Sequence, residues 1–525
     1  MRQIAAVLLA VAPLAAQVSY KQILEADAHP ENWITYSGNY SAHRHSGLDQ
    51  ITPANVGQLI PQWVYQISAR DKFETTPLVV DGVMYITEPA SDVTALDTRT
   101  GRPLWKYKRT IPADVRICCG LVNRGVAALG DLLFVGTVDA HLVALDSKTG
   151  LVRWDTKVAE YKTGHAITAA PLVVKDKVVI GIAGGEYGVR GFLDAYDAKT
   201  GLRAWRFWTV PAAGEKGSET WAGSSAATGA ATTWVTGSYD PELNLVYWGT
   251  GNPGPDWNGE VRAGDNLYSD CVLALDADTG KLKWYFQFTP HDVHDWDSTE
   301  VPVLIDGVVR GERRKLLLFA NRNGFYYVLD RRSGQFISAK AFVKQTWVKS
   351  FDDSGRPMLE PGKDPSLSGT VVYPSVPGGT NWFSPAYSPK TDLLYVAARE
   401  EGELYYVGEA DYQPGARFDG GGIRLIPGEE SYGAVRALRA ATGELAWEFR
   451  LHSPPWAGVL STAGGLVFGG TDEGDVFALD SASGKPLWRF QTGGKIRSNP
   501  MSYQSDGKQF ITMAAGSAVF TFGLK

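Results

Sequence analysis

Short runs of apolar residues that alternate with polar ones recur along the chain, and a similar polar signature follows each run. The run at residues 142–145, Leu-Val-Ala-Leu, is typical: an aspartate follows it, then Thr-Gly and then a tryptophan. Alternation with a period of two predicts a β-strand, so each copy predicts a strand, a tight turn and a second strand. The copies that end in tryptophan do so at Trp105, Trp154, Trp205, Trp284, Trp447 and Trp488. A further copy keeps Asp330 and Gly334 but lacks the tryptophan.

Each position of this signature has a mechanical role. The aspartate side chain accepts hydrogen bonds from backbone amides in the turn, and the glycine takes the left-handed conformation that closes it. The tryptophan packs between sheets. Because one four-stranded unit cannot bury both faces alone, the units must stack, and radial stacking gives a β-propeller. An array of β-sandwiches is the alternative.

The spacing of the copies sets the number of blades. Neighbouring copies lie about fifty residues apart, with inserts in the wider intervals. Trp63 indicates a decayed first copy, and the interval between Asp330 and Trp447 is wide enough for one more near residues 384–397. We therefore predict an all-β, eight-bladed β-propeller with tryptophan-docking repeats, and seven blades are the alternative. N-terminal and C-terminal strands are expected to share a blade and close the ring.

Composition and charge narrow the class of protein. The chain has 525 residues with 58 Gly and 17 Trp but only 21% charged residues, unlike coiled coils, helical bundles or disordered chains. Its formal net charge is -6 and it has no basic block, so we expect no nucleic-acid partner.

The first residues have the character of a secretory signal. Arg2 precedes a short apolar run that ends in small residues at Ala16, which predicts a signal peptide over residues 1–16. Residues 17–525 are then a single propeller domain. An uncleaved anchor or a first buried strand is the alternative. The signal predicts export to the periplasm, and no later apolar segment has the length of a membrane span.

Residues that break the repeat are candidates for chemistry. Cys118 and Cys119 are adjacent, which leaves two interpretations open: a vicinal disulfide, whose strain is typical of functional sites, or two reduced core cysteines. Cys271 lies in an apolar strand, and we expect it to be a buried free thiol.

Oxygen-bearing side chains follow separate strands, in loops where a propeller places its ligands. They are Glu186, Asn252, Asp295 and Asp297. Hard cations such as calcium bind carboxylate and amide oxygens, so this set predicts a cation site, although each residue alone is also a common turn cap. His291 and His294 lack the further ligands of a zinc site. The sequence has no Walker A loop, GxSxG, HExxH or CxxCH, which excludes P-loop nucleotide, lipase, zincin and covalent-haem chemistry.

The segment CCGLVNRG, residues 118–125, resembles a family signature. It is similar to the segment of the pyrroloquinoline quinone (PQQ)-dependent quinoprotein alcohol dehydrogenases, of the methanol and ethanol dehydrogenase large-subunit type. The resemblance runs from Asn32 to the C-terminus and implies an eight-bladed propeller with PQQ on its axis. It also implies a disulfide between Cys118 and Cys119 over one face of the quinone, and an Arg124 that binds a quinone carboxylate.

The resemblance implies the remaining site residues one position at a time. Further cofactor contacts fall on Glu74, Thr168, Gly184, Gly185, Thr232, Trp234, Arg322, Asn381 and Trp456. The metal ligands fall on Glu186, Asn252, Asp295 and Asp297. Asp295 matches the catalytic base, Arg322 the basic residue over the quinone oxygens, and Asp297 the extra acid of lanthanide-dependent members. The chain departs from the family pattern at Gly120, Ala183 and His294, and the last departure leaves Asp297 as the alternative base.

The function implied is periplasmic oxidation of a primary alcohol to an aldehyde by PQQ bound to one Ca²⁺ or lanthanide ion. An external cytochrome c is the expected electron acceptor, and a homodimer is compatible with the resemblance. A sugar or polyol dehydrogenase with the same cofactor is the nearest alternative. A non-enzymatic propeller scaffold of the outer-membrane assembly type is the more distant one.

Overall fold

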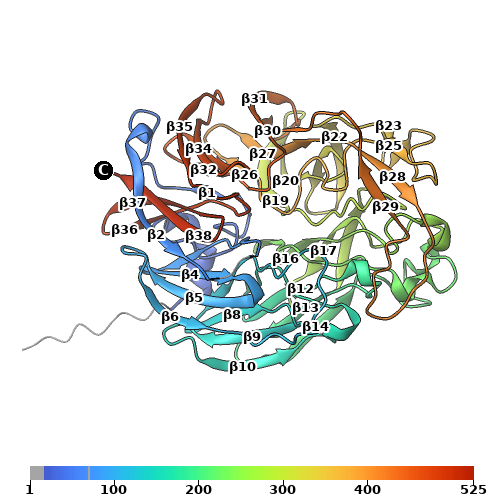
Figure 1. The fold of residues 1–525 in the computed structure, drawn as a ribbon, viewed down its shortest axis with the longest axis horizontal. Coiled ribbons are helices and arrows are strands. Elements are labelled where there is room, and N and C mark those ends of the chain that lie inside the picture. The colour runs from blue at the N-terminus through green and yellow to red at the C-terminus, as the bar shows by residue number, and fades with distance from the viewer. Residues whose placement is uncertain (1–16, 69–70) are drawn as a thin grey trace, which may run out of the picture.

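The computed structural model describes residues 17–68 and 71–525. The predicted signal peptide, residues 1–16, lies outside the described residues. The described chain is an all-β propeller in which antiparallel sheets follow one another around a centre (Figure 1). No helix in these ranges has the length and apolar character needed to cross a bilayer.

The first sheets are each built from four consecutive strands. Their strands are β3 (Leu78–Val80), β4 (Val83–Glu88), β5 (Asp92–Asp97) and β6 (Pro103–Tyr107); β7 (Ala127–Leu129), β8 (Leu132–Gly136), β9 (His141–Asp146) and β10 (Val152–Lys157); β11 (Leu172–Val174), β12 (Lys177–Gly181), β13 (Phe192–Asp197) and β14 (Arg203–Trp208); β15 (Ser238–Asp240), β16 (Leu245–Gly249), β17 (Cys271–Asp276) and β18 (Leu282–Gln287); and β19 (Val303–Val309), β20 (Glu312–Ala320), β21 (Phe325–Asp330) and β22 (Gln335–Ala341).

The later sheets include strands from distant parts of the chain. They are β26 (Ala386–Ser388), β27 (Leu393–Glu400), β30 (Tyr432–Arg439) and β31 (Leu445–Leu451); β32 (Leu460–Thr462), β33 (Leu466–Gly470), β34 (Asp475–Asp480) and β35 (Pro486–Gln491), joined by β1 (His45–Ser46); and β36 (Met501–Ser505), β37 (Lys508–Ala515) and β38 (Ala518–Leu524), joined by β2 (Leu59–Gln66).

Insertions and short helices complete the described chain. The insertions form β23 (Val348–Phe351) with β24 (Pro357–Leu359), and β25 (Thr370–Val372) with β28 (Glu403–Val407) and β29 (Gly421–Leu425). The helices are α1 (Tyr20–Leu24) and the 3-10 turns η1 (Ala26–Ala28), η2 (Val56–Gln58), η3 (Pro89–Ser91), η4 (Tyr161–Thr163), η5 (Gly185–Tyr187), η6 (Ser218–Thr220), η7 (Ser225–Thr228) and η8 (Gly259–Arg262).

Strands from the two ends of the chain pair with each other, as the sequence predicted. β2, which carries Trp63, is antiparallel to the C-terminal strand β38, with Leu59 opposite Leu524. The prediction of an additional copy near residues 384–397 was wrong. β26 and β27 in that region are the first two strands of the sheet that ends with Trp447. The wide interval instead holds the insertions β23 to β25.

The repeated glycine and tryptophan contact each other between neighbouring sheets. The indole N–H of Trp105 donates to the backbone carbonyl of Ser147 at 3.1 Å, in the turn of the next sheet. Gly150 in that turn has a φ of 70°, and a Cβ placed on it would lie 2.5 Å from the Trp105 ring. Glycine is therefore required twice, for the left-handed turn and for the close approach of the ring. Equivalent indole donations are made by Trp63, Trp154, Trp205, Trp284, Trp447 and Trp488.

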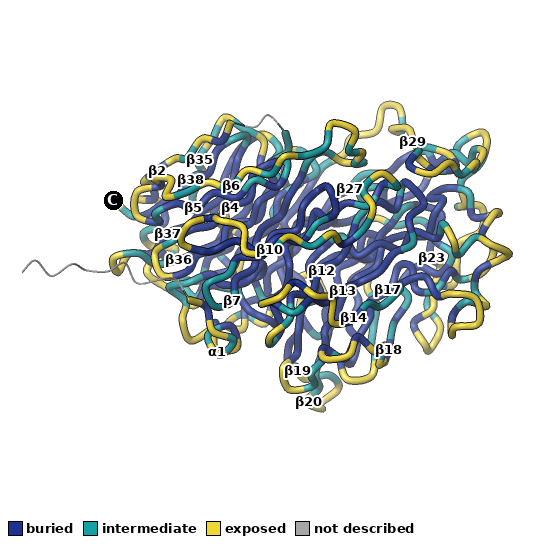
Figure 2. Tube along the Cα trace, turned by 90° about the horizontal axis from the view of Figure 1, so that it is seen from below, coloured by how far each residue is buried: buried dark blue, intermediate teal, exposed yellow. Residues whose placement is uncertain are grey.

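The middle strands of the sheets form the buried core. In β8, Leu133, Phe134 and Val135 are fully buried on both faces, because each sheet is covered by a sheet on either side. Exposed residues collect in the connecting loops (Figure 2). The core thus fixes the ends of the strands, and the loops between sheets place the functional side chains.

Candidate active site

A cavity of about 240 Å³ lies where connections from all the four-stranded sheets converge. Every cofactor, metal and catalytic candidate named from the sequence lines it. These residues are Glu74, Cys118, Cys119, Arg124, Thr168, Gly184, Gly185, Glu186, Thr232, Trp234, Asn252, Asp295, Asp297, Arg322, Asn381 and Trp456. The structure thereby brings together side chains that are separated by up to several hundred residues in sequence.

The propeller positions these residues by a regular rule. Each four-stranded sheet, and likewise the sheet of β32 to β35, contributes a lining residue from the segment just before the first of its consecutive strands, such as Glu74 before β3 and Arg124 before β7. The others are Thr168, Trp234, Asp297, Asn381, Trp456 and Arg497. A second group follows the second strand of three neighbouring sheets, namely Glu186 after β12, Asn252 after β16 and Arg322 after β20.

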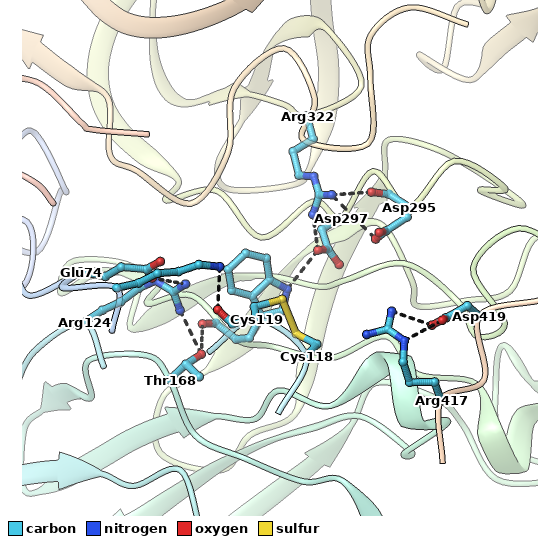
Figure 3. The surroundings of a disulfide bond; sticks show 12 residues. Glu74, Cys118, Cys119, Arg124, Thr168, Asp295, Asp297, Arg322, Arg417 and Asp419 are labelled. Carbon is cyan, nitrogen blue, oxygen red and sulfur yellow. Dashed lines mark hydrogen bonds and ion pairs between the residues drawn. A yellow bond between two sulfur atoms is a disulfide. The ribbon is translucent and has the colours of Figure 1, made fainter. Parts of the chain in front are cut away.

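A disulfide joins Cys118 to Cys119 in the cavity wall (Figure 3), as the family resemblance implied. Lys72 donates to the carbonyl oxygen of Cys119 at 2.8 Å. Gly120 follows with a φ of 101°, and the Asp71 carboxylate accepts the amide N–H of the next residue at 3.0 Å. The left-handed conformation explains why a glycine suits this position.

Arg124 is the buried cation on one side of the cavity. Its guanidinium lies 2.7 Å from the Glu74 carboxylate and donates to Thr168 Oγ1 at 2.9 Å. The rings of Trp234 and Trp382 lie 5.0 and 4.6 Å from it. Burial raises the pKa of Glu74, and Arg124 opposes that shift. Arg124 lines the cavity, so its guanidinium brings a fixed positive charge that an anionic ligand could pair with.

Asp297 lines the same cavity, as do the other acidic candidates Glu186 and Asp295. The Asp297 carboxylate accepts the backbone N–H of Asn252 at 2.9 Å and the indole N–H of Trp234 at 3.1 Å, and it pairs with Arg322. A Cβ on Gly251 would lie 2.4 Å from Asp297 Oδ1, so glycine is needed for this close approach. Burial raises the pKa of Asp297, although Arg322 opposes the shift.

Asp295 has a different environment from Asp297. Arg322 donates to the backbone carbonyl of Asp295 at 2.6 Å but lies 3.7 Å from the Asp295 carboxylate. The side chain of Asp295 is 21% exposed, whereas that of Asp297 is 8% exposed. Asp295 also has a φ of 59°, which is uncommon for a residue other than glycine and is concentrated at functional sites. Burial raises its pKa well above the usual value, against the opposing effect of Arg322.

The acidic group has the donor chemistry of a hard-cation site. A Cβ on Gly185 would lie 3.6 Å from Thr232 Oγ1 and 3.9 Å from Asn252 Oδ1, so these oxygens face the glycine pair beside Glu186. The Glu186 carboxylate lies within 4.8 Å of the disulfide sulfurs. Burial raises the pKa of Glu186, and the charge of Asp297 adds to that rise. A cation would relieve this repulsion, so the residues present fit such an ion.

Some lining residues were missed by sequence reasoning. Lys72, Trp382 and Arg497 also line the cavity, and Asp256 lies behind it. Arg497 occupies the segment before the first strand β36, which is the same place in the repeat as Glu74. Alignment of the repeats by their first strands was therefore the signal that could have identified it. Trp382 is adjacent to the candidate Asn381 but belongs to no motif.

Comparison with known proteins gives one consistent result. A family model described as glucose/ethanol/alcohol dehydrogenase, beta-propeller domain, matches residues 33–345, and a model of the outer membrane protein assembly factor BamB matches residues 431–521. The chain is 40% identical to the quinoprotein alcohol dehydrogenase PedH of Pseudomonas putida, over 98% of this chain and 90% of that protein. It is 37% identical to the lanthanide-dependent methanol dehydrogenase of Methylacidiphilum fumariolicum, over 94% of this chain and 86% of that protein.

Solved structures agree with the sequence comparison. The quinohemoprotein alcohol dehydrogenase from Comamonas testosteroni superposes with a TM-score of 0.92 at 35% identity, covering 97% of this chain and 83% of that one. A europium-containing methanol dehydrogenase gives a TM-score of 0.92 at 34% identity, with 96% of this chain and 100% of that one covered.

Proposed function

The chain belongs to the PQQ-dependent quinoprotein alcohol dehydrogenases, and from this premise we propose that it oxidises a primary alcohol to an aldehyde in the periplasm. Electrons leave to an external cytochrome c, the acceptor that the family resemblance implies. The proposal includes cleavage of residues 1–16 as a signal peptide. The mature chain, residues 17–525, is then one eight-bladed propeller. Its blades are the four-stranded sheets together with the sheet of β32 to β35 that β1 joins, and the repeat tryptophans dock neighbouring blades.

Arg124 and the disulfide define the proposed PQQ site. PQQ carries carboxylates, and the Arg124 guanidinium, held beside Glu74 and Thr168, lines the cavity as a cation for one of them. Gly184 and Gly185 also line the cavity, and a Cβ on Gly184 would clash with the carbonyl oxygen of Gly164, so the backbone beside Glu186 needs glycine there. The Cys118–Cys119 disulfide and Trp234 both line the cavity, and we assign them to the two faces of the quinone. Asn381 and Trp456 complete the contacts proposed for the cofactor.

The cation is assigned to Glu186, Asn252, Asp295 and Asp297. One Ca²⁺ or lanthanide ion fits their oxygen donors, and Asp297 adds the charge that a trivalent ion favours. Two of the similar proteins are named as a lanthanide-dependent and a europium-containing methanol dehydrogenase. When bound, PQQ supplies a quinone carbonyl that accepts two electrons, and the cation polarises that carbonyl.

Asp295 is the proposed general base. Its carboxylate is half-buried and lies 3.7 Å from Arg322, whereas Asp297 is engaged by Arg322, Trp234 and the amide of Asn252. The freer carboxylate can accept the hydroxyl proton of an alcohol at its oxygen, which favours Asp295 over Asp297 as the base. Arg322 donates to the carbonyl of Asp295, so it holds the base in place and brings positive charge to the reacting oxygens.

The convergence of all the candidate residues on one cavity is the observation that carries this proposal. The test is dye-linked oxidation by the mature chain after reconstitution with PQQ and either calcium or lanthanum. Turnover of primary alcohols with one metal is expected. Turnover confined to sugars or polyols would identify the alternative substrate class, and no turnover with any of them would contradict the proposed activity.

A further inference from the structure

Asp256 is a buried carboxylate directly behind the proposed cation site. It lies in the loop that follows β16, four residues after Asn252, and its side chain is 2% exposed. It is not one of the described residues that line the cavity. Its effect on the cavity must therefore pass through a neighbouring side chain.

That neighbour is Asn252. The Asn252 Nδ2 group donates one hydrogen bond to Asp256 Oδ1 at 2.7 Å and another to the carbonyl of Pro253 at 3.4 Å. Both donors of the amide are thus directed into the loop. The other end of the amide, Oδ1, lies toward Gly185 at the cavity wall.

The loop holds Asp256 in a fixed position. Arg262, which is fully buried, donates from Nε to the carbonyl of Pro255 at 3.0 Å and from Nη2 to the carbonyl of Asp256 at 3.3 Å. The amide of Trp257 donates to the carbonyl of Asp419 at 3.0 Å. Hydrogen bonds to the backbone before and after Asp256 therefore hold its carboxylate where it accepts from Asn252.

The two ends of an asparagine amide have opposite chemistry. The oxygen end can ligate a cation, whereas the NH₂ end repels it, and the two orientations differ only by a half-turn about one bond. The Asp256 oxygen that faces Asn252 accepts a hydrogen bond from it, so it selects the orientation with Nδ2 toward itself. We propose that Asp256 is a positioning residue that presents Asn252 Oδ1 to the cation. This inference depends on the proposed metal site at Glu186, Asn252, Asp295 and Asp297.

Asp256 also brings negative charge near the site, and two substitutions separate orientation from charge. In Asp256→Asn the charge is lost, but the new amide can still offer its oxygen to Asn252 Nδ2. In Asp256→Leu both the charge and the acceptor are lost. Partners of metal ligands typically alter metal affinity by about 10-fold to 100-fold. We expect that loss for Asp256→Leu, and a change within about threefold for Asp256→Asn.

Metal affinity is measured directly on the mature chain with PQQ present. Equilibrium dialysis against La³⁺ or Ca²⁺, with bound metal counted by mass spectrometry, needs no turnover. Equal losses in the two variants would show that charge is responsible and would overturn the positioning role. An unchanged affinity in Asp256→Leu would also overturn it. If the unsubstituted chain binds neither metal, the proposed metal site itself fails. That result is distinguishable from the two outcomes that overturn the positioning role.

The same substitution made in a variant that already carries Asn252→Asp distinguishes a positioning role of Asp256 from general damage to the loop. Asn252→Asp places two equivalent oxygens at position 252, so the orientation of the group no longer matters. Adding Asp256→Leu to Asn252→Asp should then change metal affinity by less than about threefold, a coupling that a double-mutant cycle measures. A further loss of 10-fold or more in that background would show that Asp256 acts by maintaining the fold. Circular dichroism and the apparent Tm report whether each variant folds.

Discussion

Aspartates in the repeat turns and aspartates in the cavity have opposite environments. In the turn after β13, the Asp197 carboxylate accepts the amide N–H groups of Lys199 and Thr200 at 3.1 and 2.8 Å, and the Thr200 hydroxyl at 2.8 Å. These hydrogen bonds from Thr200 and its neighbours hold the pKa of Asp197 below its usual value. Such a carboxylate stabilises the turn and is already satisfied.

Burial dominates the environment of the cavity carboxylates Glu186, Asp295 and Asp297 and of Asp256 behind them, and it raises the pKa of each. Asp297 does accept hydrogen bonds from Asn252 and Trp234 and pairs with Arg322, but its pKa is still raised. Clustered carboxylates with raised pKa values cost stability unless a ligand compensates them. The same residue type therefore contributes to the fold in one place and marks the functional site in the other.

The largest expected effect is at Asp295. Asp295→Asn removes the proposed proton acceptor but keeps the shape of the side chain, so we expect kcat to fall by about 10²-fold to 10⁴-fold while PQQ stays bound. Asp276→Asn, in the turn after β17, is the matched control and should leave the turnover of the holoenzyme nearly unchanged. Dye-linked kinetics measure kcat, and quinone absorbance measures how much PQQ stays bound. Unchanged turnover in Asp295→Asn would remove this residue from the mechanism.

The next effect is at Arg124. Arg124→Met keeps much of the apolar packing but removes the charge beside Glu74 and Thr168. A hydrogen bond to a charged group contributes about 1.5–3 kcal/mol, so the affinity for PQQ should fall by about 10-fold to 100-fold. Fluorescence titration with PQQ measures this affinity in the unsubstituted chain and in the variant. The exposed Arg332, which pairs with the turn residue Asp330, provides the control Arg332→Met, and equal affinities in the two variants would exclude Arg124 from the quinone site.

The smallest effect is on stability, in the turns. Asp197→Ala removes the acceptor of the turn hydrogen bonds and should lower the free energy of unfolding by about 1 kcal/mol at neutral pH, with no change in PQQ affinity. Because the pKa of Asp197 is lowered in the fold, its contribution is present above the unfolded-state value and is lost as pH falls through the lowered one. Urea unfolding of both proteins should therefore converge at acidic pH. A difference that persists there would contradict the role of the ionised carboxylate.

The repeated part of the fold was predictable because local chemistry specifies it. The Asp, Gly and Trp positions encode a turn, a left-handed residue and an inter-sheet contact. The pairing of β2 with β38 was expected because the two ends of a closed ring share a sheet. The wrong assignment at residues 384–397 arose because long insertions separate β27 from β30 within one sheet. Local pattern does not reveal which strands pair across such an insertion.

The site was less predictable from local pattern. Cys118 and Asp295 were singled out from the residues, but their roles, and Arg124 itself, came from a family resemblance. Their proximity depends on how the sheets are arranged around the centre. Arg497 and Asp256 were missed, since one is recognised by its place before a first strand and the other by a contact with Asn252. Single-residue signals in loops carry little information until the loops are brought together.

The central claim is that the cavity binds PQQ together with one cation, and the most direct measurement is the binding stoichiometry of the purified mature chain. PQQ is titrated in the presence of calcium or of lanthanum, and bound quinone and metal are counted separately after dialysis. We predict one PQQ and one cation per chain, with the quinone retained in Asp295→Asn and weakened in Arg124→Met. Failure to bind PQQ with either metal would contradict the account and favour a propeller that acts as a scaffold.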